Sequence, residues 1–140
     1  MVFSAPELDF LSAQRLGRLA TMQPDGTLQV NPVGFMFNAE FGTFDIHGNR
    51  ISASRKFKNV ADNGKVAFVV DDVASVDPWR VRCLEIRGHA KAVTSTGTPR
   101  EGLADALIRI YPERVISFGI EDPDQEPREM TPHNRDVVSG

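Results

Sequence analysis

The chain has 140 residues, of which 41% are hydrophobic and 25% are charged, and its formal net charge is -3. These values are typical of one globular domain, and the mild acidity gives no reason to expect nucleic acid as a partner. A lone cysteine, Cys83, excludes an internal disulfide, and no apolar run has the form of a signal peptide or the length of a membrane span. We therefore expect a cytoplasmic protein.

The N-terminal segment predicts a short helix. Ser4 and Glu7 have the spacing of a capping box, with Pro6 in the first turn. Gly17 is expected to end this helix after Leu16.

A β-hairpin is predicted next. Residues 18–23 and 28–38 have the composition of strands, and Pro24, Asp25 and Gly26 form a turn between them. Within the second strand the apolar positions change phase, which predicts a bulge or bend at residues 31–34. Backbone groups at a bulge are free to contact a ligand.

A third strand at residues 43–47 leads into a basic helix. Ser52 or Ser54 can cap its N-terminus, and Gly64 is a natural end. Residues 50–58 contain four basic residues and no acidic one.

The basic residues of this segment are Arg50, Arg55, Lys56 and Lys58. Arg55 and Lys56 are predicted in the first helical turn, where the helix dipole disfavours cations by about 0.3–1 kcal/mol each. A bound anion would offset that cost, which indicates a phosphate site. The alternative is an ordinary solvated helix face that happens to be basic.

The second half of the chain predicts two more strands. Residues 65–71 are apolar on both faces, which is typical of a central strand, and residues 83–93 alternate like a half-buried antiparallel strand. Together these elements predict a mainly β fold, a small antiparallel barrel with a few helices.

The C-terminal third predicts a helix, a strand and a tail. A capping box from Thr98 to Glu101 opens the helix, whose apolar face would run to Tyr111 before Pro112 ends it. A last strand is expected at residues 114–120. The barrel domain would therefore span residues 1–120, followed by an acidic, proline-rich and loosely held tail at residues 121–140.

The run from Arg55 to Val60 and the strand from Lys65 to Asp71 give the chain its strongest resemblance to a known family. From about Glu7 to Ile120 it resembles the pyridoxamine 5'-phosphate oxidase-like proteins. Within them, it is most similar to the small flavin and deazaflavin oxidoreductases that use coenzyme F420. The resemblance implies a Greek-key split β-barrel and a homodimer with its cofactors at the subunit interface.

The resemblance also implies a set of cofactor-binding residues. Lys56, Lys58 and Asn59 match positions that hold the cofactor phosphate, with Arg55 as a helper. The segment from His47 to Ser52 would follow the ribityl chain, the backbone of residues 31–33 would edge the ring, and Trp79 would reach the site from the partner subunit. Trp79 as a plain anchor of the dimer core is equally compatible with its type. The full set is Asn31, Pro32, Val33, His47, Asn49, Ser52, Arg55, Lys56, Lys58, Asn59 and Trp79.

The implied activity is transfer of a hydride from reduced coenzyme F420 to an electron-poor double bond of a small organic substrate. One alternative is an FMN-dependent oxidase or reductase of the same fold, and another is a flavin-binding module without turnover. Residues 130–135 do not match the substrate-phosphate motif of true pyridoxamine phosphate oxidases.

Other chemistry has little support in the sequence. His47, His89 and His133 lie far apart without carboxylates or thiols at ligand spacing, so no metal site is expected. Helix capping explains Ser52 and Ser54 better than a nucleophile would. No catalytic residue is assigned.

Overall fold

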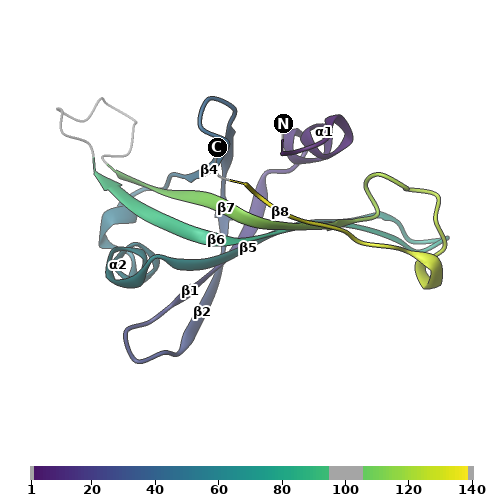
Figure 1. Ribbon diagram of the computed structural model, residues 1–140. Coiled ribbons are helices and arrows are strands. Elements are labelled where there is room, and N and C mark those ends of the chain that lie inside the picture. Colours follow the sequence, from purple (N-terminus) through teal and green to yellow (C-terminus); the bar gives the residue numbers. More distant parts are fainter. Residues whose placement is uncertain (1, 95–105, 139–140) are drawn as a thin grey trace.

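Eight antiparallel strands form one continuous curved sheet in the computed structural model, which describes residues 2–94 and 106–138 (Figure 1). The strands are β1 (Leu16–Met22), β2 (Leu28–Gly34), β3 (Met36–Asn38), β4 (Thr43–Ile46), β5 (Lys65–Ser75), β6 (Arg80–Thr94), β7 (Ala106–Phe118) and β8 (His133–Asp136). The helices are α1 (Ala5–Ser12) and α2 (Arg55–Asn63), with 3-10 turns at Ile51–Ala53 and Pro127–Glu129.

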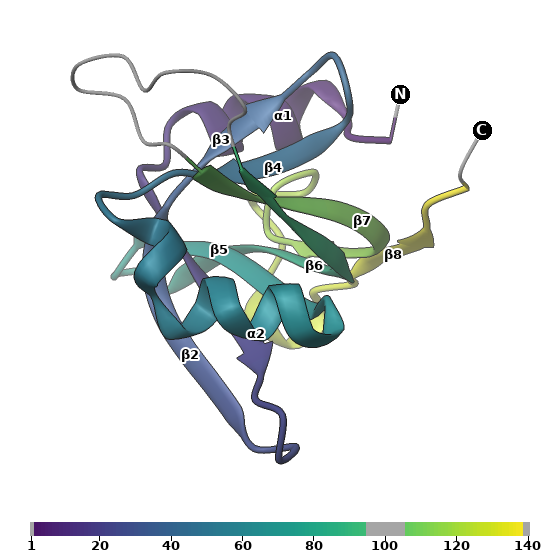
Figure 2. The same ribbon diagram turned by 90° about the vertical axis from the view of Figure 1, so that its left-hand side faces the viewer.

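The strand order closes the sheet into a barrel. It runs β2-β1-β5-β6-β7-β4-β3, with β8 added beside β7. Only Phe35 separates β2 from β3 in the chain, although these strands stand at opposite ends of the order. The sheet must therefore curl until its two ends meet at Phe35, and this curl is visible in Figure 2. The predicted split β-barrel is confirmed.

The barrel interior is filled by aromatic rings. Phe44 is fully buried, and its ring centroid lies 5.3 Å from that of Phe37, 5.5 Å from Phe68 and 5.6 Å from Phe3. Such tilted and edge-on pairs are stabilising beyond the area that they bury. Gly17 makes room for this packing, because a Cβ there would lie 2.3 Å from Cζ of Phe68.

The capping box of α1 is confirmed, but the predicted end of the helix is wrong. The backbone N–H of Ser4 donates to Glu7 Oε1 at 2.9 Å, and the N–H of Glu7 donates to Ser4 Oγ at 3.3 Å. The helix ends at Ser12, and Gly17 lies inside β1. Gly17 serves close packing rather than helix termination.

The hairpin turn is confirmed. Of the bulge or bend predicted at residues 31–34, the bulge is wrong, and the strand instead bends directly after Gly34, where β2 gives way to β3. Gly26 has a φ of 89°, and the β1–β2 ladder runs without a register shift from Leu16 opposite Gly34 to Met22 opposite Leu28. The change of phase has another cause, because Leu28 and Val30 point outward and are 76% and 63% exposed. Two apolar side chains therefore face solvent in the single chain.

The helix predicted up to Pro112 is wrong over residues 106–112, and its start lies outside the described residues. Residues 106–112 belong to β7, where Ala106, Ile108 and Ile110 are buried and the residues between them are less so. The spacing of the apolar residues fits both the helical and the strand period, and the long pairing with β6 selects the strand. Pro112 lies opposite Gly88 at a register shift, a position in a sheet where proline is tolerated.

The C-terminal segment is held more firmly than predicted. Residues 133–136 form β8, which pairs with β7 from Arg114 opposite Asp136 to Ser117 opposite His133. Arg135 of β8 contacts the buried carboxylate of Glu7 in α1, and Ser117 Oγ donates to Glu7 Oε2 at 2.6 Å. The expectation of a loosely held tail is wrong for this strand.

Candidate cofactor site

A cavity of about 210 Å³ lies where the end of β2 meets the loop after β4 and the first turn of α2. Figure 2 shows α2 beside β2, with the loop after β4 leading into the helix. The cavity is lined by Pro32, Val33, Gly34, Ile46, His47, Gly48, Asn49, Ile51, Ser54 and Lys56. The structure thus brings together five residues of the predicted set: Pro32, Val33, His47, Asn49 and Lys56.

The start of α2 is fixed by Ser54. Its Oγ accepts from the N–H of Phe57 at 3.3 Å and donates to the carbonyl oxygen of Ile51 at 2.6 Å. Gly64 ends the helix in the left-handed conformation, with a φ of 71°. Ser54 is therefore the N-cap, and Ser52 lies in the preceding 3-10 turn, outside the cavity lining.

The predicted conflict between charge and helix dipole is present in the structure. Arg55 and Lys56 occupy the first turn of α2, which holds no acidic residue. Across residues 2–94 and 106–138, no ion pair involves Arg50, Arg55, Lys56 or Lys58. The positive charge at this helix start is thus uncompensated by the described part of the chain, which favours a bound anion.

The edge of β2 supplies backbone groups to the same region. β2 pairs with β1 along one side and stands at the end of the strand order, so its other edge makes no ladder among the described strands. Asn31 lies on this strand with its side chain half-buried, and Pro32 and Val33 line the cavity. Unpaired N–H and C=O groups at a strand edge can bond a flat polar ring.

Asn59 does not line the cavity. It is fully buried, and its amide nitrogen donates to Thr21 Oγ1 at 3.1 Å and to Gln29 Oε1 at 3.3 Å. Its oxygen accepts from Arg55 Nε at 3.0 Å. Lys58 also lies outside the lining, and its side chain is exposed.

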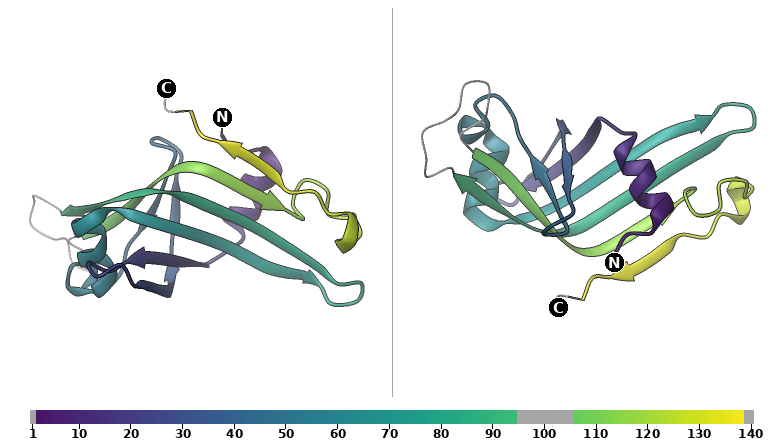
Figure 3. Two further views of the ribbon diagram at one scale, coloured as in Figure 1. Left: turned by 60° about the horizontal axis from the view of Figure 1, so that its bottom comes forward. Right: turned by 90° about the horizontal axis from the view of Figure 1, so that it is seen from above.

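Trp79 lies far from this cavity within one chain. It follows β5 in the turn that leads to β6, and it is 53% exposed. The tip of this hairpin and α2 stand at opposite ends of the molecule in Figure 1, and the views in Figure 3 agree. Trp79 can reach a cofactor site only in a second copy of the chain.

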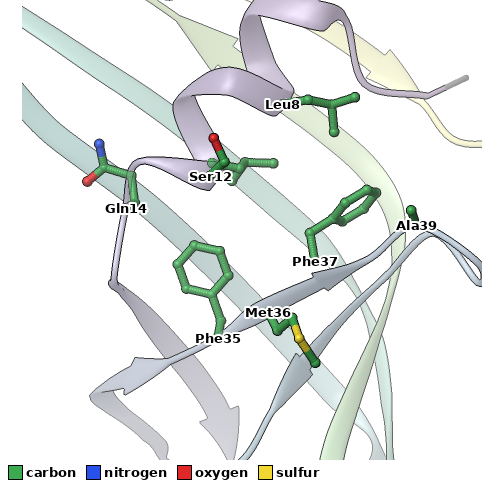
Figure 4. Close-up of a pocket in the computed structure, with 8 residues that line it drawn as sticks. Leu8, Ser12, Gln14, Phe35, Met36, Phe37 and Ala39 are labelled. Atoms are coloured by element: carbon green, nitrogen blue, oxygen red, sulfur yellow. The ribbon is translucent and has the colours of Figure 1, made fainter.

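A second, larger cavity was not predicted from the sequence. It measures about 440 Å³ and lies between α1 and the bend that joins β2 to β3 (Figure 4). Its lining consists of Leu8, Leu11, Ser12, Gln14, Phe35, Met36, Phe37 and Ala39. In Figure 4 the rings of Phe35 and Phe37 lie on the side of β3 that faces α1, and Leu8 belongs to that helix. The strand alternation of Phe35 and Phe37 was the available signal, but it cannot show which element lies opposite.

The described part of the chain offers neither a metal site nor a reactive thiolate. Residues 2–94 and 106–138 hold no group of three His, Cys, Asp or Glu side chains that could bind a metal. Burial, and then the charges of Asp71 and Glu85, raise the pKa of the Cys83 thiol to about 11, so it is protonated at neutral pH. No helix in the described ranges is long and apolar enough to cross a membrane.

Comparison with known proteins identifies the family. The model of the family "Pyridoxamine 5'-phosphate oxidase" matches residues 7–139. The chain belongs to this family. It is also 46% identical over 122 residues to a 5a,11a-dehydrotetracycline/5a,11a-dehydrooxytetracycline reductase of Streptomyces rimosus, covering 86% of each chain.

Solved structures agree with the fold. A protein described as an F420 reductase is 28% identical and has a TM-score of 0.52, with 69% of this chain and 85% of that one covered. A conserved hypothetical protein from Mycobacterium tuberculosis has a TM-score of 0.66 at 22% identity, with 84% and 85% covered. The predicted family and its barrel are confirmed.

Proposed function

We propose that this protein is a reductase that uses coenzyme F420 to transfer a hydride to an electron-poor carbon–carbon double bond of a small organic substrate. The observation that carries the proposal is the uncompensated basic first turn of α2 beside a cavity. The 46% identity to a dehydrotetracycline reductase supports oxidoreductase activity, and the 28% identity to an F420 reductase supports the choice of cofactor.

The residues of the cavity fit the phosphate end of such a cofactor. Lys56 and the free N–H groups of the first turn would hold the phosphate, since both lie where the dipole favours an anion. His47 and Asn49 would lie along the ribityl chain, and the free edge of β2 would meet the ring. The cofactor supplies the hydride when it is bound, and the protein binds it, orients it and excludes water.

The cofactor is F420 rather than FMN because of the amount of positive charge. FMN ends at its phosphate, whereas coenzyme F420 continues into a lactyl and polyglutamate tail. Arg50, Arg55 and Lys58 offer charge beyond the cavity itself. Arg82 and Arg80 do not add to this charge, because Arg82 pairs with Asp72 and Arg80 pairs with Glu126 at 3.4 Å.

The larger cavity supports an apolar organic substrate. Its volume of about 440 Å³ and its largely apolar lining are typical of pockets for small molecules. A dehydrotetracycline, which the name of the Streptomyces relative gives as its substrate, is likewise an organic molecule with a reducible carbon–carbon double bond.

The active unit is a homodimer. Leu28 and Val30 are 76% and 63% exposed on the outer face of β2, and Leu16 on β1 is 51% exposed. Leu84 is buried in the core of the single chain, and Phe35 and Phe37 pack against that core, so they contribute little to an interface. The β1–β2 face would therefore form the interface, and Trp79 would arrive from the partner.

Substitution of Lys56 tests the proposal. Loss of one charge-assisted contact to phosphate corresponds to about 1.5–3 kcal/mol, so Lys56→Ala should raise the Kd for coenzyme F420 by roughly tenfold to a hundredfold. Lys65→Ala is the matched control, because Lys65 is an exposed lysine just beyond the opposite end of α2. Fluorescence titration gives both constants, and an enone substrate with reduced F420 gives turnover. Equal Kd values for the two variants would remove the first turn of α2 from the site.

A further inference from the structure

We propose that Asn59 is a positioning residue, which holds the guanidinium of Arg55 so that Arg55 binds the anionic tail of the cofactor beyond its phosphate. The inference rests on the proposed function, and it replaces the expectation that Asn59 binds the phosphate itself.

The hydrogen bonds of Asn59 assign its role. The side chain is fully buried, and both N–H donors are used, on Thr21 at 3.1 Å and on Gln29 at 3.3 Å. Its oxygen accepts from Arg55 Nε at 3.0 Å. Asn59 has no donor left for a phosphate, and its contacts with β1 and β2 fix the orientation of the oxygen that Arg55 meets.

Arg55 keeps most of its binding capacity. A guanidinium has five N–H donors in one plane, and only Nε–H is engaged with Asn59. Among the described residues the two Nη groups donate no hydrogen bond, and no carboxylate lies within 4.0 Å of them. Fixing Nε fixes the plane of the fork, so the four remaining donors are oriented in advance for carboxylate or phosphate oxygens.

The partner of Arg55 is neutral, which preserves its charge. An aspartate at position 59 could accept the same hydrogen bond, but it would also pair with the guanidinium and cancel its attraction for an anion. A buried asparagine orients Arg55 without this effect. An ion pair would suffice if Arg55 served stability alone.

Arg55 and Lys56 serve different parts of the ligand. Consecutive residues point about 100° apart around an α-helix. Of these two, Lys56 lines the cavity at the start of α2 and Arg55 does not. Lys56 is thus placed for the phosphate, and Arg55 is placed outside the cavity for the charges that follow it. FMN has no such charges.

Two probes separate this role from a structural one. The first is coenzyme F420 with its polyglutamate tail, and the second is the same deazaflavin ending at its phosphate. Arg55→Gln should raise the Kd of the tailed probe about tenfold or more. Asn59→Leu, which leaves Arg55 present but unheld, should raise it about threefold to tenfold. Neither variant should change the Kd of the truncated probe by more than about twofold, and Lys56→Ala should weaken both probes.

Matched variants complete the test. Thr21→Val removes one of the two contacts that orient Asn59 and leaves its contact with Arg55, so it should raise the Kd of the tailed probe less than Asn59→Leu does and leave the truncated probe within about twofold of the parent. The double variant Arg55→Gln/Asn59→Leu should bind no more weakly than Arg55→Gln alone. If Asn59→Leu does not fold, Asn59→Asp retains the acceptor, and it should weaken only the tailed probe by neutralising Arg55.

Three outcomes would overturn the inference. Equal weakening of both probes by Asn59→Leu would make Asn59 a purely structural residue. Additive losses in the double variant would show that Asn59 does not act through Arg55. Unchanged binding of the tailed probe to Arg55→Gln would refute this inference and leave the phosphate site intact, provided that Lys56→Ala still weakens both probes. If Lys56→Ala weakens neither probe, the proposed function fails as well.

Discussion

Substitution of Val30 by aspartate should break the homodimer without unfolding the chain. Val30 is 63% exposed on the outer face of β2, opposite Ala20 in β1, which in turn lies opposite Ala67 in β5. These three side chains form an apolar row across the sheet, on the face that the barrel interior does not use. An aspartate there costs the single chain little, because the side chain is already mostly in water.

The size of the effect follows from this exposure. Full burial of a valine side chain is stabilising by about 1.5–3 kcal/mol, so covering the exposed 63% of Val30 contributes about 1–2 kcal/mol per subunit. A two-fold interface contains the residue twice, which gives about 2–4 kcal/mol and a rise in the dimer dissociation constant of roughly thirtyfold to a thousandfold. Desolvation of two carboxylates would increase it further.

Sedimentation velocity across a range of protein concentrations measures this constant. Val138→Asp is the matched control, because Val138 is another exposed valine, 87% exposed, beyond the end of β8. The parent and Val138→Asp should sediment as dimers at micromolar concentration, and Val30→Asp as a folded monomer with weakened cofactor binding. A parent protein that is monomeric, or two variants with the same dissociation constant, would refute the assignment of the interface to this face.

Two further predictions concern stability. Asp45 is 2% exposed and accepts from Arg109 Nε at 3.0 Å and Nη2 at 3.1 Å, so Asp45→Asn should lower the free energy of unfolding by about 3–5 kcal/mol in urea titrations. Asp71→Asn, which breaks the half-exposed pair with Arg18, should lower it by less than about 1 kcal/mol, and equal losses would contradict the argument. Burial alone would raise the pKa of Glu7 and of Asp45, but hydrogen bonds, chiefly from Arg135 and Arg109, hold each below its ordinary value of 4.5 or 3.8. The stability that these ionised groups contribute is present at neutral pH and is lost as the pH falls below those values. The urea midpoint should therefore drop between pH 5 and about pH 2. A midpoint that does not change over this range would contradict the prediction.

Local signals in the sequence were sufficient to predict the capped helix and the hairpin. Ser54 and Gly64 bound α2 because a hydroxyl satisfies the first N–H groups and glycine adopts the left-handed conformation at the end. Gly26 acts in the same local way in the turn of the hairpin. Such features depend on a few adjacent residues, so the sequence predicts them well.

Features that depend on partners distant in the chain were missed. Residues 106–112 have apolar spacing that fits a helix or a strand, and only the ladder with β6 selects the strand. Leu28 and Val30 suggested a bulge because an outward apolar face is unexpected in a single chain. β8 was missed because its short polar run is held by pairing with β7 and by the contact of Arg135 with Glu7.

The candidate site also combines residues that are close in the sequence with residues whose surroundings depend on distant strands. Lys56 and His47 line one cavity, since their helix and strand end are consecutive in the sequence. Asn59 was assigned to the phosphate because it matches a position of the family motif, whereas its surroundings are made by Thr21 and Gln29, from strands that are distant in the sequence. Burial of a polar side chain can be seen only once those strands are in place.

Cofactor preference is the central claim, and a salt series tests it most directly. Binding of coenzyme F420 and of FMN to the parent protein is titrated from low to high ionic strength. The additional charges of the F420 tail should make its affinity fall more steeply with salt, and F420 should bind more tightly than FMN at physiological ionic strength. Tighter binding of FMN under that condition, with equal salt dependence for the two ligands, would contradict the account and indicate an FMN-dependent enzyme.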